Sequence, residues 1–145
     1  MRSMTCRVLL ALAIAACSSS GYGPDDPGDG DELDVSGTWT VTATLIEEDC
    51  PEDVEEVNTG TIQIEQNGTQ ITFRQGSIVA RGSINLQTGE FMISGMIEAI
   101  DGLILIMEEG RFTSDARYTS ESSFTFQPTV GPSCTILTSD SGVRQ

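Results

Sequence analysis

The side chains that carry most enzyme chemistry are scarce in this chain. It contains no lysine and no histidine, so the commonest pairs of nucleophile and base are missing. No His and Cys set has the spacing of a metal site, and no glycine-rich stretch has the pattern of a phosphate-binding loop. Two carboxylates across a cleft could still hydrolyse a glycoside. Only Glu108 is predicted to point inward, so we expect no enzyme activity, no catalytic residue, no metal and no cofactor.

An apolar run from Val8 to Ala16 follows Arg2 and Arg7 near the N-terminus. Its nine residues are far fewer than the ~20 that span a bilayer as a helix, and they fit the apolar part of a secretory signal. The run therefore predicts a signal peptide over residues 1–16, which is removed on export.

Cys17 ends the tetrapeptide Ile14-Ala15-Ala16-Cys17, which resembles the lipobox of bacterial lipoproteins. The resemblance implies cleavage before Cys17, a diacylglycerol on its sulfur and an acyl chain on its new amino group. These acyl chains would hold the protein on a membrane without a transmembrane helix. In a cell with an outer membrane, Ser18 in place of Asp implies sorting to that membrane. The alternative is an ordinary secretory signal that leaves Cys17 as a free thiol.

The stretch after Cys17 is rich in Ser, Gly, Pro and Asp, and its only large apolar residues are Tyr22 and Leu33. Such a segment cannot bury enough surface to fold. Residues 17–34 are therefore expected to be a lipidated cysteine followed by a flexible acidic linker. The remaining residues, 35–145, are enough for one domain with its own core.

The chain that remains after cleavage would be strongly acidic. Five arginines against 22 acidic residues leave a net charge of −17. Nucleic acids and anionic membrane surfaces attract clustered Arg and Lys, so neither is an expected partner of the domain. The densest acidic stretch is 47–56, with seven carboxylates around Cys50. We interpret it as a solvated loop, and Ca²⁺ binding is the alternative.

From Val35 onward the polarity of the chain alternates with a period of two, beginning with Trp39, Val41 and Ala43 between threonines. This pattern predicts half-buried strands, and no stretch has convincing helical periodicity. The predicted strands are 38–46, 58–66, 69–74, 77–87, 90–99, 103–113, 117–127 and 133–139. The turn sequences between them include Asn67-Gly68, Gln75-Gly76, Thr88-Gly89 and Asp101-Gly102.

These turns predict a register in which apolar residues pair on one face. The expected pairs are Ile64 with Ile71, Phe73 with Ile78, Ile84 with Ile93, Ile97 with Ile106, and Phe112 with Tyr118. Closing eight such strands removes the exposed edges, so we expect an all-β fold, a small eight-stranded up-and-down antiparallel barrel. Cys50 and Cys134 would then lie at the same rim. In an exported domain they are expected to form a disulfide across the seam.

Gly37-Thr38-Trp39 at the start of the first strand resembles the Gly-x-Trp signature of lipocalins. The resemblance implies an eight-stranded barrel that carries a small apolar ligand. It also implies that an arginine late in the chain, here Arg144, packs on Trp39. The domain is smaller than a typical lipocalin and the usual C-terminal helix is missing.

One inward layer of the barrel is expected to consist of small and polar residues. Its members are Gly82, Gly95, Glu108 and Ser122, with Gly110 and Ser120 beside them. One interpretation is a small ligand pocket in which Glu108 is the polar group. The other is that the glycines are bends or bulges that let a small barrel curl, and that Glu108 leaves the sheet at a bulge.

The outer face of the fifth and sixth strands is predicted to carry an apolar patch of Met92, Met96, Leu105 and Met107. Such a patch indicates a protein partner or a homodimer, or else a face that a loop covers. Taken together, the sequence predicts a lipid-anchored envelope lipoprotein of binding type, with a small apolar ligand in the barrel. The alternative is a structural or protein-interaction surface module with a sealed barrel core.

Overall fold

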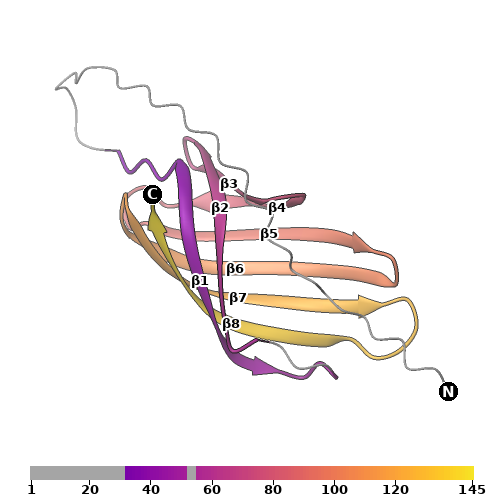
Figure 1. The fold of residues 1–145 in the computed structure, drawn as a ribbon. Helices are drawn as coiled ribbons and strands as arrows, with labels where there is room; N and C mark the ends of the chain where they lie inside the picture. The colour runs from indigo at the N-terminus through magenta and orange to yellow at the C-terminus, as the bar shows by residue number, and fades with distance from the viewer. Residues whose placement is uncertain (1–31, 52–54) are drawn as a thin grey trace. The chain divides into compact units, whose positions relative to one another are not determined.

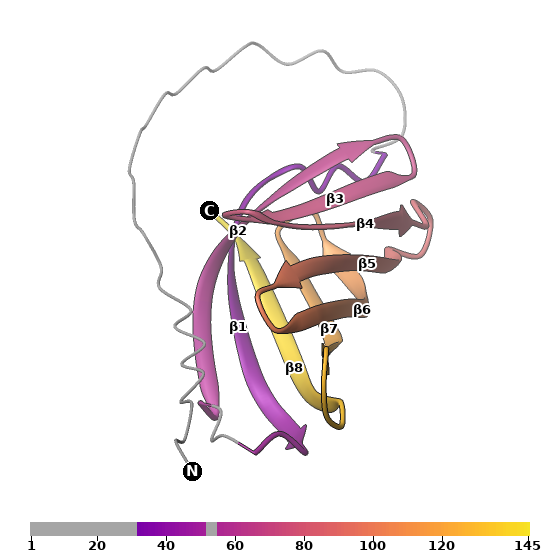
Figure 2. The same cartoon turned by 90° about the vertical axis from the view of Figure 1, so that its right-hand side faces the viewer.

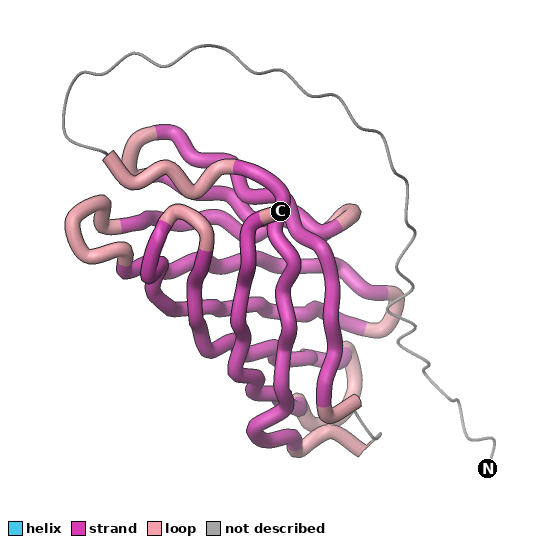
Figure 3. The backbone as a smooth tube through the Cα atoms, turned by 60° about the vertical axis from the view of Figure 1, so that its left-hand side comes forward, coloured by secondary structure: helices cyan, strands magenta, loops and turns pink. Residues whose placement is uncertain are grey.

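The structure is a computed structural model that describes residues 32–51 and 55–145. Within these residues the chain forms eight strands: β1 (Gly37–Glu48), β2 (Val57–Asn67), β3 (Gln70–Gln75), β4 (Ile78–Ile84), β5 (Glu90–Ala99), β6 (Gly102–Ser114), β7 (Arg117–Pro128) and β8 (Cys134–Arg144). Figure 3 shows only strands, loops and turns in this described part. The predicted signal peptide, Cys17 and most of the predicted linker lie outside the described residues.

The strands form a closed barrel in chain order (Figure 1). Each strand pairs with the next in antiparallel orientation, and β8 returns to pair with β1. This confirms the predicted all-β up-and-down architecture. Alternating sequences favour it because each strand can bury one face inside the barrel and expose the other to water. The last strand is longer than predicted, since it continues to Arg144 instead of ending at residue 139.

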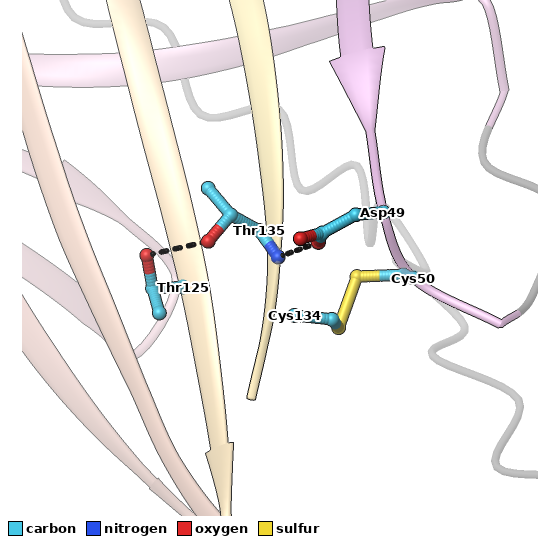
Figure 4. The surroundings of a disulfide bond; sticks show 5 residues. All are labelled: Asp49, Cys50, Thr125, Cys134 and Thr135. Atoms are coloured by element: carbon cyan, nitrogen blue, oxygen red, sulfur yellow. Dashed lines mark hydrogen bonds between the residues drawn. A yellow bond between two sulfur atoms is a disulfide. The ribbon is translucent and has the colours of Figure 1, made fainter. Parts of the chain in front are cut away.

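The predicted disulfide joins Cys50, just after β1, to Cys134, the first residue of β8 (Figure 4). The two Cα atoms are 4.9 Å apart. Beside the bond, the Asp49 carboxylate accepts a hydrogen bond from the backbone N–H of Thr135. Since β1 and β8 are the first and last strands, the disulfide fastens the seam at which the barrel closes. Both thiols are consumed by this bond, so they are not free to bind a metal beside Asp49.

The register was predicted wrongly in four hairpins. Ile64 pairs with Phe73, Phe73 with Ala80, Ile84 with Phe91, and Ile97 with Ile104, so each predicted pairing was wrong by two residues. The pairing of Phe112 with Tyr118 is confirmed. A shift of two residues returns every side chain to its original face, so the same residues still point inward.

The glycines and one asparagine explain why these turns were misplaced. Gly68 and Gly76, each with φ of +58°, are the first residue of their two-residue turns rather than the second. Gly102 lies in β6, paired with Ala99 and Pro128, and not in a turn. Glycine suits this position because a Cβ would come within 2.1 Å of the Gln127 carbonyl oxygen. Between β4 and β5, the Asn85 side chain accepts two backbone N–H hydrogen bonds and holds a longer loop.

The segment before β1 closes one end of the barrel, beside the β2–β3 hairpin (Figure 2). Val35 is fully buried, and its carbonyl accepts a 2.9 Å hydrogen bond from Trp39 Nε1. The Gln66 carboxamide accepts from the Val35 N–H and donates to the Leu33 carbonyl, both at 2.9 Å. Leu33, which belongs to the predicted linker, also packs against the core. This is the closed end of the barrel.

Arg144 lies at the closed end, opposite Trp39 in the register of β1 and β8. Its guanidinium lies against Gly37, where a Cβ would be 3.1 Å from Nε. Its Nη1 donates to the carbonyls of Asp34 and Asp115 at 3.1 and 3.3 Å. Gly37 also has φ of +137°, a value that favours glycine. The glycine of the Gly-x-Trp motif therefore provides the space that the arginine occupies.

The buried core fills the half of the barrel next to the closed end. Its aromatic rings have neighbouring centroids 5.0 to 6.0 Å apart, and they belong to Trp39, Phe73, Phe91, Phe112 and Tyr118. None of these side chains is more than 6% exposed. The Tyr118 ring covers Gly142, where a Cβ would lie only 2.0 Å from a ring carbon. The aromatic packing therefore depends on a glycine at this position of β8.

Candidate functional site: an acidic belt inside the barrel

Five polar side chains cross the barrel interior on three adjacent strands. They form what we call the acidic belt: Glu108 on β6, Ser120 and Ser122 on β7, and Thr138 and Asp140 on β8. The register places Ser122 between Glu108 and Thr138, and it places Ser120 opposite Asp140. Ser120, Ser122, Thr138 and Asp140 are 3% to 8% exposed, and Glu108 is partly buried. Since residues paired across strands share a face, the belt is a continuous polar surface inside the barrel.

Two hydrogen bonds from serines to carboxylates run diagonally across the belt. Ser120 Oγ donates to Glu108 Oε1 at 2.6 Å, and Ser122 Oγ donates to Asp140 Oδ2. The central strand, β7, therefore supplies both donors, and each neighbouring strand supplies one carboxylate. Hydrogen bonds to a charged acceptor are stronger than neutral ones, so they fix the orientation of both acids.

The pKa values of the two acids are raised by their surroundings. Burial raises the pKa of Glu108 to about 7; the hydrogen bond from Ser120 opposes this shift, and the charge of Asp140 adds to it. Burial also raises the pKa of Asp140, against the effect of the nearby Ser122 and Thr138 hydroxyls. The pKa of Tyr118 is raised too, first by burial and then by the charges of Glu108 and Asp140. Ionising this part of the interior is therefore unfavourable.

Several oxygen atoms of the barrel interior are buried without a hydrogen-bond partner in the part of the chain that the structure describes. They are Oδ1 of Asp140, Oγ1 of Thr138 and Oε2 of Glu48, a residue that pairs with Ile136 after a bulge in β1. A buried acceptor without a partner is costly, and a buried carboxylate more so. No hydrogen bond or ion pair joins an arginine of residues 32–51 and 55–145 to the acidic belt. Among the described residues, the belt therefore has buried acceptors without donors and no positively charged partner.

The acidic belt separates the aromatic core from an apolar layer at the other end of the barrel. Along β7 the inward residues run from Tyr118 through Ser120 and Ser122 to Phe124 and Phe126. Tyr118 is 2% exposed, whereas Phe124 and Phe126 are only partly buried. Solvent therefore reaches apolar side chains that point into the barrel on the far side of the belt. We call this the open end.

The predicted pocket residues fall into two groups. Glu108, Ser120 and Ser122 come together in the acidic belt. At Gly82, Gly95 and Gly110, a Cβ would lie within 1.8, 2.6 and 2.3 Å of a backbone oxygen on the neighbouring strand. These three glycines therefore let adjacent strands approach closely, and the space beside them is filled by backbone rather than left open for a ligand.

Asp140 and Thr138 were missing from the predicted site, and the expectation of a single inward carboxylate is wrong. The last strand was predicted to end at residue 139, one residue before the second acid. The alternation from Ile136 through Thr138 and Asp140 to Gly142 continues the inward face, and it could have located both residues.

The four residues of the predicted outer patch lie on the outside of β5 and β6. Met92, Met96 and Met107 are 54%, 60% and 55% exposed, and Leu105 is partly buried opposite Met96. The methionine side chains are thus in contact with solvent.

The fold and the acidic belt define a closed eight-stranded antiparallel barrel with buried acids between an aromatic core and an open apolar end. Comparison with protein-family models, with curated proteins and with solved structures found no match to this chain. A helix with the length and apolar character of a transmembrane segment does not occur in residues 32–51 and 55–145.

Proposed function

We propose that the protein is a lipid-anchored lipoprotein of the bacterial cell envelope, held in the outer membrane through Cys17, whose barrel binds a small apolar ligand. The anchor rests on the N-terminal sequence, where a short apolar run ends in Ile14-Ala15-Ala16-Cys17. The disulfide is of the kind found in exported domains.

The contrast between the two ends of the barrel carries the binding proposal. At the closed end, Val35 and Trp39 are completely buried. Toward the open end, apolar side chains that face inward remain only partly buried, and they are Ile78, Ile97, Ile104, Phe124, Phe126 and Ile136. Two apolar residues of the loops at this end, Ile100 and Val130, are 102% and 89% exposed. An apolar, solvent-accessible interior with a few polar groups is typical of sites for small ligands.

A second candidate function is a protein-interaction module with a sealed core. The exposed methionines on β5 and β6 favour it, because flexible, polarisable Met side chains suit a surface that packs against another protein. In this case the outer patch, and not the barrel interior, would be the functional surface.

Native mass spectrometry of the lipid-free chain 18–145 tests the first candidate. The unlipidated form is preferable because the detergent needed for the anchored form would compete for an apolar site. After incubation with a bacterial lipid extract, we expect a small molecule to remain bound to the folded chain. A bare chain at every extract concentration would contradict the proposal.

Two neighbouring substitutions separate the candidates. Ile104 faces the interior and Leu105 faces outward, and both are partly buried. We expect Ile104→Asn to abolish the bound mass and Leu105→Asn to retain it, with circular dichroism confirming that both variants fold. Loss of a protein partner in Leu105→Asn, with no ligand in any form, would support the second candidate instead.

A further inference from the structure

The acidic belt holds two buried carboxylates with no cation from the described residues beside them. Each carboxylate receives one serine hydrogen bond, and Asp140 is only 6% exposed. A buried negative charge is strongly unfavourable unless a cation or several donors compensate it. The described residues supply the hydroxyls of Ser120, Ser122 and Thr138 and no arginine or lysine, so a positive group from outside the chain would complete the belt.

The unpartnered atoms of β8 define where that group would bind. Asp140 Oδ1 and Thr138 Oγ1 are both buried without a hydrogen-bond partner, in side chains that are 6% and 8% exposed. Glu108 lies across β7 from them and uses Oε1 for its bond with Ser120. A primary ammonium group carries three N–H donors, which can be shared among the Asp140 and Thr138 oxygens and the Glu108 carboxylate.

The order of layers along the strands defines the rest of the ligand. On β6 the inward residues run from Glu108 to Ile106 and Ile104 toward the open end, and on β7 they run from Ser122 to Phe124 and Phe126. A molecule that entered from the open end would pass these apolar side chains before it reached the belt. Its positive group would therefore lie deep in the barrel and its apolar body would lie toward solvent.

We propose that the ligand of this barrel is an amphiphile with a protonated primary amine, and that the amine binds between Glu108, Asp140 and Thr138. This inference rests on the proposed ligand-binding function and specifies the class of ligand. The groups that face Glu108 are Tyr118, Ser120 and Ser122 from β7, Thr138 and Asp140 from β8, and Ile93 from β5.

Three probes of one chain length test the proposal: decylamine, decanol and decanoate, each titrated below its micelle concentration into the lipid-free chain 18–145 at pH 8. At this pH the amine is protonated and Glu108 is mostly ionised. Because a hydrogen bond to a charged group outweighs a neutral one, we expect decylamine to bind at least about tenfold more tightly than decanol. Decanoate should bind most weakly, since it brings a second negative charge.

Variants of the belt should remove this preference. We expect Glu108→Gln and Asp140→Asn each to bring decylamine to within about threefold of decanol. Glu109→Gln and Glu121→Gln are matched controls, because both acids are exposed and their change should leave the preference intact. If Asp140→Asn does not fold, Glu108→Gln alone still decides the result. At pH 5 the wild-type preference for the amine should fall toward that of the Glu108→Gln variant.

Each other outcome overturns a different statement. Equal affinity for decylamine and decanol would refute the amine and leave the proposed function standing. No binding of any probe, together with no ligand from the lipid extract, would refute the proposed function itself. A melting temperature that rises with Ca²⁺ or Mg²⁺, depends on Glu108 and Asp140, and is accompanied by no amine binding would assign the belt to a metal instead.

Discussion

At the level of single residues, Glu108 and Asp140 are unusual because neither has a compensating positive charge within residues 32–51 and 55–145. Each is held by one serine, and β7 places the two serines so that each reaches across to a different strand. The hydrogen bonds orient the acids but do not remove the cost of ionising them, since burial still raises both pKa values. The acids therefore reduce the stability of the empty barrel at neutral pH, a cost that a bound cation would remove.

Glu108 should make stability fall as pH rises. The unfolded chain releases this proton near pH 4.5, whereas the folded chain holds it up to about pH 7. Between these values the folded state binds more protons, so the free energy of unfolding decreases with pH, by at most about 3 kcal/mol in total. We expect Glu108→Gln to match the wild type at pH 4 and to exceed it at pH 8.

Urea unfolding at several pH values between 4 and 8 measures this difference. The comparison of variant with wild type isolates Glu108 from the repulsion among the other acids. Glu109→Gln, which changes an exposed acid on the opposite face of β6, should keep the wild-type slope. A Glu108→Gln variant with the same pH dependence as the wild type would contradict the raised pKa.

At the level of strands, alternation alone identified which residues face inward but could not identify their partners. A register that is wrong by one residue would pair apolar residues with polar ones on the opposite face, so the sequence pattern would have excluded it. The actual errors were of two residues, and a pattern with a period of two cannot detect such a shift because every side chain stays on the same face. Phe112 and Tyr118 were paired correctly across the turn that separates them. The strand bounds also explain which residues of the site were predicted. Glu108, Ser120 and Ser122 lie in the middle of predicted strands, whereas Asp140 lies just beyond the predicted end of the last strand.

The disulfide belongs to this scale because it links the first and last strands. It joins residues 84 positions apart, and closing so long a loop in the unfolded chain contributes up to about 4.5 kcal/mol in the chain-entropy model. We expect the double variant Cys50→Ser, Cys134→Ser to unfold at a clearly lower urea concentration. Reductant should lower the wild-type midpoint and leave that of the variant unchanged. Equal midpoints for the oxidised wild type and the variant would show that the strand pairing alone holds the seam.

At the level of the whole molecule, the barrel has two unlike ends. The chain enters at the closed end through Leu33 and Val35, and β8 finishes there at Arg144. The disulfide and the partly buried apolar side chains lie toward the other end. The closed barrel followed from eight alternating strands, but the difference between its ends did not. The difference between the ends depends on how the segment before β1 packs, and the composition of that segment predicts a linker.

The anchor can be tested independently of the barrel. In a bacterial host, Cys17→Ala in the full chain should abolish incorporation of labelled palmitate and move the protein from the membrane fraction to the soluble fraction. Cys6→Ala is the matched control, because it removes a cysteine from the predicted signal and should change neither result. A Cys17→Ala chain that still carries label and stays with the membrane would refute the lipoprotein assignment.

The link between Cys50 and Cys134 also limits how the domain responds to mechanical force. A pull applied at residue 35 and at the C-terminus cannot extend the loop that the disulfide closes, and this loop contains the whole of β2 to β7. Only the residues before Cys50 and after Cys134 can be drawn out, roughly 90 Å of chain instead of roughly 390 Å for the reduced domain. Those residues are β1 and β8, so force would separate the seam strands while the intervening strands stay covalently tied together.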